Sequence, residues 1–267
     1  MVDMKTCVFY LIEIVSVCSM LVSCQAGFIG DDGGWQEGTA TWYGPPPPDG
    51  DGSEGGACGY GGLVKTNMFN SRIAAVGPAL FVEGKGCGAC YQVKCKSGIC
   101  SQNPVSVVIT DECGGCNETH FDLSGNAFAG MAYPDNATEL LDEGLVDISF
   151  KRVACDYEGN NITFKVSPHA TAYWFSVLIE YVNGAGDIGS VYLQQAASDG
   201  WEEMTEQSGA KWALDSGSYL KAPFSIRVES LSSGDILTAY EVIPENWNAG
   251  DTYTSHVNYD PTLLQEF

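Results

Sequence analysis

The chain has few basic residues. Its 267 residues include 12 Lys and Arg against 34 Asp and Glu, which gives a formal net charge of −22 at pH 7. Nucleic-acid binding and attraction to anionic membranes both depend on clustered Lys and Arg, so this balance argues against both kinds of partner. Hydrophobic residues make up 45 % of the chain and charged residues only 17 %. This composition is typical of a folded protein with one or two hydrophobic cores.

The sequence contains only one long apolar run. It covers residues 7–23, follows a short start that contains Lys5, and is interrupted by Glu13. Small residues follow, so residues 1–26 are interpreted as a secretory signal peptide that is cleaved after Cys24 or Ala26. An uncleaved anchor is the alternative, although the run is short of about 20 clean apolar residues. The signal predicts a secreted, extracellular protein without a membrane attachment after cleavage.

Cysteine is absent from the last 112 residues. Removal of the signal leaves eight cysteines, and an even number in an exported protein indicates four disulfides. They are Cys58, Cys87, Cys90, Cys95, Cys100, Cys113, Cys116 and Cys155. Two C-x-x-C pairs also fit metal-ligand spacing, but an oxidising compartment favours disulfides. We therefore expect no metal and no other cofactor.

Three Asn-x-Thr triplets fit a glycoprotein that passes through the secretory route. They begin at Asn117, Asn136 and Asn161. Each is a candidate N-glycosylation site.

The first half of the chain alternates short strand-like runs with turn signals. Runs rich in Val, Ile and aromatic residues cover 79–82, 90–95, 105–110 and 146–153. Residues 124–132 have the spacing of a short helix, and residues 44–56 form a loop dense in Pro, Gly and Asp. Short strands combined with disulfides predict a small β-barrel over residues 27–160.

The composition changes after Cys155, and residues 156–161 have the character of a turn. Alternation of apolar and polar residues is then clearer, at 162–166, 174–182, 189–195, 225–230 and 236–242. Such spacing without cysteine predicts an antiparallel β-sandwich over residues 161–267. The expected fold class is therefore all-β, with the barrel first and the sandwich second.

Two carboxylates of the first half are the main candidates for chemistry. Asp111 follows an apolar run and so ends a predicted strand, and Asp122 follows His120 and Phe121. Two carboxylates that converge on a groove can serve as acid and base in glycoside hydrolysis. Asp122 equally suits the N-cap of the helix that follows, so the pattern alone leaves both roles open.

An ordered set of motifs resembles the signature segments of plant expansins. They are Thr39-Ala-Thr-Trp-Tyr-Gly44, Gly56-Ala-Cys-Gly-Tyr-Gly61, Gly86-Cys-Gly-Ala-Cys90, Ile109-Thr-Asp111 and His120-Phe-Asp-Leu-Ser-Gly125. The tail segments 223–227, 242–247 and 253–255 are similar to the β-expansin branch, which includes the group-1 grass pollen allergens. The match runs in order from about residue 38 to 259, and the ordered set is far more specific than any single motif.

The resemblance implies a six-stranded double-psi β-barrel, like that of family-45 endoglucanases, followed by an immunoglobulin-like, carbohydrate-binding sandwich. It also implies the disulfides Cys58–Cys87, Cys90–Cys155 and Cys95–Cys100. The remaining pair, Cys113–Cys116, would be a fourth bridge, across only two intervening residues.

Asp122 matches the general acid of the related endoglucanases. Their catalytic base lies just after the segment equivalent to Thr41–Tyr43, where this chain has Gly44 and Pro45. Neither residue can accept a proton, and an inverting glycosidase needs a base about 6.5–9.5 Å from the acid. The resemblance therefore implies a non-lytic, wall-loosening protein that binds glycans and disrupts their non-covalent adhesion. The implied partners are xylan, cellulose or mixed-linkage glucan, and the implied state is a monomer.

The residues expected to act on the glycan fall into two groups. A groove with Thr41, Tyr43, Asp111, His120 and Asp122 would hydrogen-bond the chain and deform it through binding free energy. Trp42 and Trp174 would form an aromatic platform for the sugar faces. Ser208 stands where better-studied β-expansins have a tryptophan, and the flanking Trp201 and Trp212 are expected in the core.

Two rival functions remain open. One is a weak endo-glycanase with Asp122 as general acid and Asp111 as substitute base, and the other is a passive carbohydrate-binding protein. The charge bears on the ligand, because residues 25–156 carry 17 acidic against 7 basic residues and residues 157–267 carry 15 against 4. The pollen relatives are basic, which suits acidic xylans. This chain would repel such polymers at low salt, unless the charge serves only solubility.

Overall fold

The computed structural model describes residues 34–47, 56–66 and 69–262. The expected signal peptide, residues 1–26, lies outside the described residues. Within the described ranges, no helix is long and apolar enough to cross a membrane.

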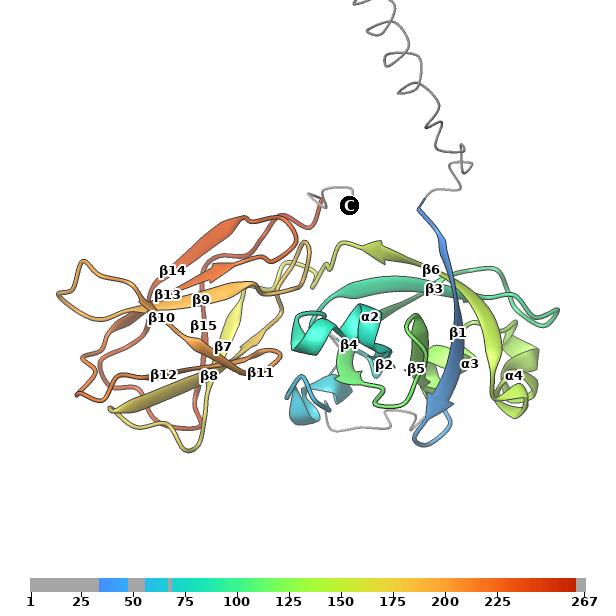
Figure 1. The fold of residues 1–267 in the computed structure, drawn as a ribbon, viewed down its shortest axis with the longest axis horizontal. Helices are drawn as coiled ribbons and strands as arrows, with labels where there is room; N and C mark the ends of the chain where they lie inside the picture. The colour runs from blue at the N-terminus through green and yellow to red at the C-terminus, as the bar shows by residue number, and fades with distance from the viewer. Residues whose placement is uncertain (1–33, 48–55, 67–68, 263–267) are drawn as a thin grey trace, which may run out of the picture. The chain divides into compact units, whose positions relative to one another are not determined.

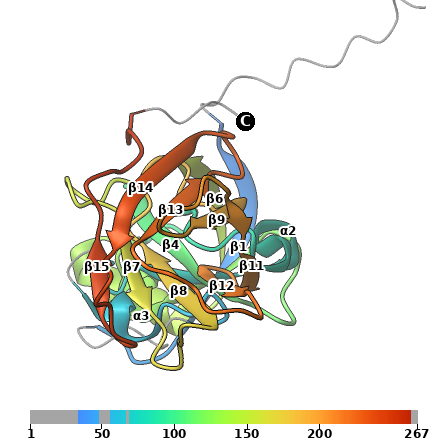
Figure 2. The same cartoon turned by 90° about the vertical axis from the view of Figure 1, so that its left-hand side faces the viewer.

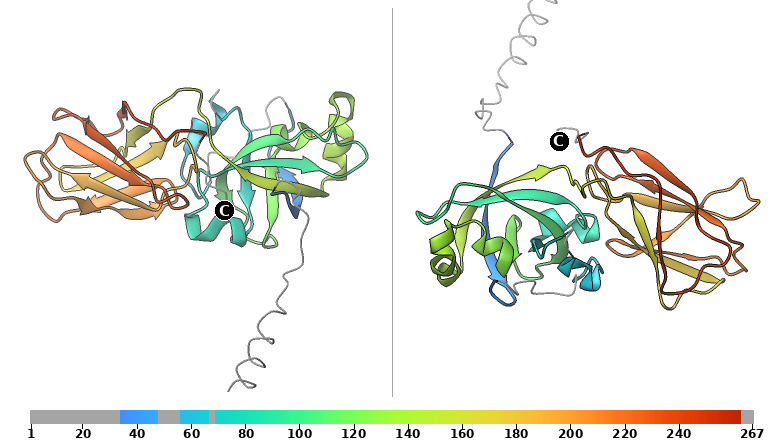
Figure 3. Two further views of the ribbon diagram at one scale, coloured as in Figure 1. Left: turned by 90° about the horizontal axis from the view of Figure 1, so that it is seen from above. Right: turned by 180° about the vertical axis from the view of Figure 1, so that it is seen from behind.

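The first part of the described chain is a closed barrel of six strands in the order β1-β5-β2-β4-β3-β6 (Figure 1). The strands are β1 (Gln36–Tyr43), β2 (Ile73–Val76), β3 (Cys90–Cys95), β4 (Val105–Glu112), β5 (His120–Ser124) and β6 (Val146–Val153). β1 pairs parallel with β5 and antiparallel with β6, which closes the barrel (Figure 3). Alternate residues point inward, where the rings of Tyr91, Phe121 and Phe150 pack with centroids 5.0–6.1 Å apart.

Short helices cover the connections of the barrel. They are α2 (Pro78–Phe81), α3 (Gly125–Ala129), α4 (Ala137–Glu143) and the 3-10 turns η1 (Gly61–Lys65), η2 (Val82–Gly84) and η3 (Pro134–Asn136). The strand predicted at 79–82 is wrong, because Pro78 begins a helical turn there and Val82 ends it in the left-handed region. The strand of this region is β2, just upstream. Ser124 caps α3 by accepting the N–H of Ala127, so Asp122 is not the cap.

Four disulfides join the described cysteines in the barrel region: Cys58–Cys87, Cys90–Cys155, Cys95–Cys100 and Cys113–Cys116. These are the four pairs that the family resemblance implies. Cys58–Cys87 fixes the loop that follows residue 55 to the segment before β3, and Cys90–Cys155 ties the start of β3 to the residues that follow β6.

The second part is a β-sandwich of two antiparallel sheets, seen from its end in Figure 2. One sheet contains β10 (Glu202–Glu203), β9 (Ser190–Gln194), β13 (Phe224–Glu229) and β14 (Ile236–Ile243). The other contains β11 (Thr205–Ser208), β12 (Lys211–Asp215), β8 (Trp174–Glu180), β7 (Thr163–Val166) and β15 (Thr252–Thr254). Phe164, Phe175 and Phe224 fill the space between the sheets. The predicted all-β class, barrel first and sandwich second, is confirmed.

Four strands of the sandwich escaped prediction: β10, β11, β12 and β15. β10 has only two residues, and β11 reads Thr-Glu-Gln-Ser, which has no apolar residue to mark a buried face. Such segments become strands because neighbouring strands supply their hydrogen-bond partners.

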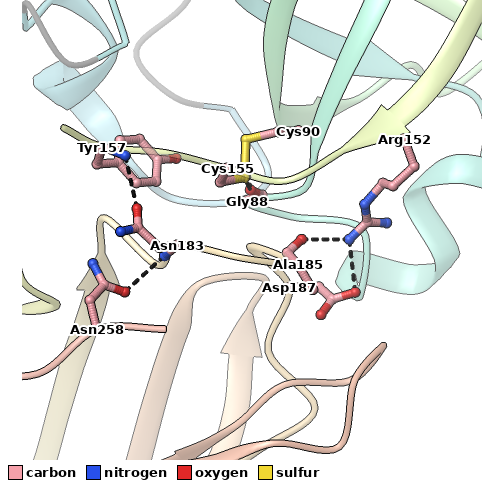
Figure 4. Close-up of a disulfide and its surroundings, with 9 residues drawn as sticks. All are labelled: Gly88, Cys90, Arg152, Cys155, Tyr157, Asn183, Ala185, Asp187 and Asn258. Carbon is pink, nitrogen blue, oxygen red and sulfur yellow. Dashed lines mark hydrogen bonds and ion pairs between the residues drawn. A yellow bond between two sulfur atoms is a disulfide. The ribbon is translucent and has the colours of Figure 1, made fainter. Parts of the chain in front are cut away.

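The residues after β6 bond directly to the loop that follows β8 (Figure 4). Cys155 and Gly184 exchange two backbone hydrogen bonds, of 2.7 and 3.0 Å. Arg152 of β6 donates from Nη2 to the carbonyl of Ala185 at 2.6 Å and to Oδ2 of Asp187 at 2.9 Å. Asp187 is 2 % exposed, so a buried ion pair and a disulfide-anchored backbone bridge join barrel and sandwich residues at one point.

Candidate functional site

Four residues on neighbouring barrel strands form one transverse row. Thr41 of β1 pairs with Asp122 of β5, Asp122 pairs with Ala75 of β2, and Ala75 pairs with Asp111 of β4. Directly paired residues lie on the same face of a sheet, so the two carboxylates flank the small side chain of Ala75. They are two strands apart, which places their Cα atoms about 10 Å from one another.

A chain of hydrogen bonds runs through the first part of this row. The Thr41 hydroxyl donates to Oδ1 of Asp122 at 2.7 Å and lies 2.8 Å from Nε2 of His120. Because that hydroxyl has one proton to give, the ring of His120 donates to Thr41 from Nε2. The neutral ring then accepts at Nδ1 from the Thr39 hydroxyl, 2.8 Å away. The network assigns this tautomer, and it orients His120 and Asp122 through two threonines of one strand.

The electrostatics of His120 agree with a neutral ring. The side chain is 6 % exposed. Burial lowers the pKa of His120 below its usual value of 6.5, and the nearby Asp122 carboxylate acts in the opposite direction. His120 therefore serves this site as a hydrogen-bonding partner near neutral pH.

Asp111 is bound to a loop. Its Oδ1 accepts the backbone N–H of Ala57 at 2.7 Å and that of Glu112 at 2.8 Å. Gly56 approaches the carboxylate so closely that a Cβ at this position would collide with it. Asp111 therefore holds the loop that begins at Gly56 against the end of β4, and this contact uses one of its two oxygens.

Trp42 is not brought together with Thr41 and Asp122. Adjacent residues of a strand point to opposite faces, and Trp42 points away from the row. Its indole N–H donates to the carbonyl of Leu141 at 3.0 Å, and its ring packs on the barrel core. Tyr43, two residues beyond Thr41, lies on the same side of β1 as Thr41 and is half-buried.

Trp174 lines a groove of about 480 Å³ on the outer face of the five-stranded sheet. Its walls include Lys165, His169 and Lys211 from the sandwich and Tyr60 from the barrel. The Ala210 N–H donates to the carbonyl of Cys58 at 3.2 Å, so barrel and sandwich residues meet along this groove. A half-buried indole beside polar side chains suits the stacking of a sugar ring.

Trp212 and Trp201, the two tryptophans on either side of Ser208, differ in burial. Trp212 is 3 % exposed and belongs to the core of the sandwich, as expected. Trp201 is only half-buried and stacks on the guanidinium of Arg227 at 4.1 Å, so its expected place in the core is wrong. Ser208 is half-buried at the end of β11 and lines a second pocket, described below.

The candidate glycosylation sites differ in their surroundings. Asn117 is exposed in the turn between Cys116 and β5. Asn136 is half-buried and donates from its side chain to Glu139 at 2.9 Å, and Asn161 is half-buried before β7. Within the described ranges, no three His, Cys, Asp or Glu side chains lie close enough together to hold a metal ion.

Sequence reasoning missed several residues of the two sites. Thr39 lies in the motif Thr39–Gly44, but the motif does not indicate that Thr39 contacts His120. Its spacing of two from Thr41 could have done so, because it places both threonines on one face of the strand. Lys165 and Lys211 could have drawn attention because the last 111 residues contain only four basic side chains. The sequence could not indicate the role of Ala57, because only its backbone N–H takes part, as the donor to Asp111.

Two family models match the chain. One is described as the expansin C-terminal domain and matches residues 162–244, and the other is described as lytic transglycolase and matches residues 73–150. Expansin-B3 of Arabidopsis thaliana is 47 % identical over 232 residues, which cover 86 % of this chain and 87 % of that protein. Putative expansin-B2 of Arabidopsis thaliana is 50 % identical over 232 residues, with 85 % and 84 % coverage. Expansin-B17 of Oryza sativa subsp. japonica is 48 % identical over 234 residues, with 86 % and 83 % coverage.

Solved structures share the fold. The crystal structure of an apo Clavibacter michiganensis expansin matches with a TM-score of 0.65 and 20 % identity, over 85 % of this chain and 98 % of that one. A mutant of that expansin in complex with cellohexaose matches with a TM-score of 0.65 and 19 % identity. At these identities, the two matches show a shared fold.

Proposed function

The chain belongs to the β-expansin family, and we propose that it loosens plant cell walls by binding wall polysaccharide and disrupting non-covalent adhesion between glycans, without hydrolysis. The observation that carries this proposal is the state of the two carboxylates. Asp122 already accepts the hydroxyl of Thr41, and Asp111 already accepts two backbone N–H groups. These hydrogen bonds hold both carboxylates in place and support a role for them in binding rather than in catalysis.

The position after β1 also supports a non-lytic role. Residues 44–47 are Gly-Pro-Pro-Pro, which contain no carboxylate. A hydrolase that uses Asp122 as general acid would need another base to activate water. Binding alone can still do work on a glycan, because contacts along the surface favour a chain conformation that fits it.

The nature of the ligand follows from the surface and from the relatives. A mutant of the Clavibacter michiganensis expansin was solved in complex with cellohexaose, which supports a glycan as the ligand of this chain. In this chain, Trp174 offers a ring for stacking, and the row from Thr41 to Asp111 offers polar groups. We infer that xylan, cellulose or mixed-linkage glucan is bound by a secreted, monomeric protein.

A combined assay tests the proposal. Purified protein is added to heat-killed wall strips under constant load in acidified buffer, and extension is recorded. Reducing ends are measured in parallel on cellulose, xylan and mixed-linkage glucan. We expect extension without sustained release of reducing ends. Asp122→Asn should lose most of the extension, while Asp135→Asn, an exposed carboxylate on η3, should behave as wild type.

The outcomes separate the rival functions. Sustained release of reducing ends that disappears in Asp122→Asn would show an endo-glycanase with Asp122 as acid and Asp111 as base. The distance between β5, which carries Asp122, and β4, which carries Asp111, is compatible with this rival function. Inverting glycosidases have their two carboxylates about 6.5–9.5 Å apart. Binding to the polymers without extension of the strips would show a passive carbohydrate-binding protein.

A further inference from the structure

A second pocket of about 380 Å³ lies between the barrel and the β11–β12 turn. The barrel contributes Ala57, Phe81, Glu83 and Gly84, and the sandwich contributes residues 206–209. Pockets of 300–1,000 Å³ are typical of small-molecule sites, and this one is at the small end of that range. It has room for a single sugar ring rather than a chain.

The pocket adjoins both parts of the proposed glycan surface. Its residue Ala57 donates its backbone N–H to Asp111, so one wall is joined to the carboxylate row. Gln207 lines this pocket and also the groove that contains Trp174. A glycan that extends from Asp111 to Trp174 would therefore lie beside residues that line the pocket.

The walls are fixed before any ligand binds. Lys85 forms an ion pair with Glu206 at 2.6 Å, donates to the carbonyl of Gly189 at 3.3 Å, and lies 5.0 Å from the ring centre of Trp212. Gly84 and Gly209 both have positive φ, and a Cβ on Gly209 would collide with Cys87. The backbone therefore approaches closely on both sides, and a preorganised pocket loses little entropy on binding.

The lining selects a neutral, hydroxyl-rich ligand. The half-buried Ser208 hydroxyl has no hydrogen-bond partner among the described residues, and the exposed side chains of Glu83 and Gln207 add acceptors and donors at the rim. The exposed carboxylate of Glu83 disfavours an acidic sugar, since a uronate would place a second negative charge beside it, whereas Lys85 already neutralises Glu206. A neutral pentose or hexose meets donors and acceptors without that cost.

We propose that this pocket binds one neutral sugar branch of a substituted wall glycan whose backbone lies along the surface between Asp111 and Trp174. The inference rests on the proposed function and adds a preference for branched over unbranched glycans. Ser208 is the determinant, because its small side chain leaves the pocket open.

The test compares two neutral xylo-oligosaccharides with the same backbone length, one unbranched and one with arabinose branches. Affinities are measured by isothermal titration calorimetry on the full secreted protein. We expect wild type to bind the branched ligand about tenfold more tightly, the effect of one or two added hydrogen bonds. Ser208→Trp should remove that preference by filling the pocket, and should keep or raise affinity for the unbranched ligand, because its ring adds a stacking surface.

Controls separate the pocket from the surface as a whole. Ser198→Trp places the same ring on an exposed loop of the sandwich and should leave the preference unchanged. Glu83→Gln should keep the branched preference and reduce discrimination against a glucuronate-branched ligand. Equal wild-type affinity for both neutral ligands, or equal losses for both in Ser208→Trp, would overturn the inference alone. Absence of wild-type binding to either ligand would overturn the inference, and the proposed function would fail with it only if the wall strips also do not extend.

Discussion

Thr41 and Asp122 are directly paired across strands β1 and β5, and the hydroxyl of Thr41 donates to Oδ1 of Asp122 at 2.7 Å. The two residues are 81 positions apart in the chain, and their side chains meet because β1 and β5 run parallel and in register. The same hydroxyl receives the ring N–H of His120, so one threonine orients both His120 and Asp122.

Removal of the Thr41 hydroxyl should destabilise the barrel. Thr41→Val keeps the shape of the side chain but leaves Nε2 of His120 and one oxygen of Asp122 without this partner. The expected loss is about 1–3 kcal/mol in the free energy of unfolding, measured by denaturant titration. Thr41→Ser retains the hydroxyl and should lose less than about 1 kcal/mol. Equal losses in the two variants would contradict the prediction, because only Thr41→Val removes the hydrogen bonds.

The pKa of His120 should fall further in Asp122→Asn. Burial lowers it, and the Asp122 carboxylate partly opposes that effect by favouring the charged ring. NMR titration of the ring protons measures the value, and His169→Gln and His256→Gln identify the remaining signals. Because the folded value lies below 6.5, this residue's contribution to stability is complete above pH 6.5 and decreases as the pH falls toward the folded value. A rise of the pKa in Asp122→Asn would contradict the assigned network.

Glu180 should make the protein less stable as the pH rises. Burial raises its pKa from 4.5 to about 7, and Lys165 on the neighbouring strand acts in the opposite direction. The folded state therefore retains a proton that the unfolded chain has lost, so stability from this group is complete below pH 4.5 and is lost as the pH rises through about 7.

Glu180→Gln tests this dependence, because it mimics the protonated carboxyl. At about pH 8 the variant should be more stable than wild type by about 1–2 kcal/mol, a figure reduced from the full shift for solvent screening. At acidic pH the two proteins should unfold at nearly the same denaturant concentration. Glu203→Gln, at an exposed position, should leave the pH dependence unchanged. A constant difference between wild type and Glu180→Gln at all pH values would contradict the prediction.

Arg152 and Asp187 should behave as a coupled pair at the contact between barrel and sandwich residues (Figure 4). Arg152→Met leaves the buried Asp187 carboxylate without its cation, although Ser230 and Ser232 still donate to it. The expected loss is about 3 kcal/mol. Asp187→Asn alone should also destabilise, and the double variant should lose at least about 1 kcal/mol less than the sum. Additive losses in a double-mutant cycle would show that the two side chains act independently.

Much of the fold was accessible from local pattern. Val and Ile runs bounded by turn residues marked β3, β4 and β6, and alternation marked β7, β8, β9, β13 and β14. Prediction failed where an element depends on its neighbours. Residues 78–81 contain apolar side chains that suit a strand, but Pro78 and the contacts of the loop make them helical. β11 has no apolar pattern and becomes a strand only because β12 pairs with it.

The candidate site also combines features that the sequence indicates with features that depend on the tertiary structure. Motif spacing marked Asp111, His120, Asp122 and Thr41, because resemblance operates residue by residue along the chain. It did not reveal that the indole of Trp42 packs on the barrel core and donates to Leu141, or that Asp111 holds the backbone of Ala57. The period of two along a strand fixes which residues share a face, whereas the identity of the neighbouring strand is a tertiary property.

The scarcity of basic residues was determined by the sequence alone, and it argues against nucleic acid and anionic membranes at any fold. The eight cysteines that follow residue 26, the order of the strand-rich halves and the family motifs were also present in the sequence. Only the tertiary structure decided where the few cations lie: Lys165 and Lys211 in the groove of Trp174, and Lys85 bound to Glu206 behind the second pocket. The physical reason is that net charge is a sum over the chain, whereas a ligand meets only the charges that folding brings within a few ångströms of it.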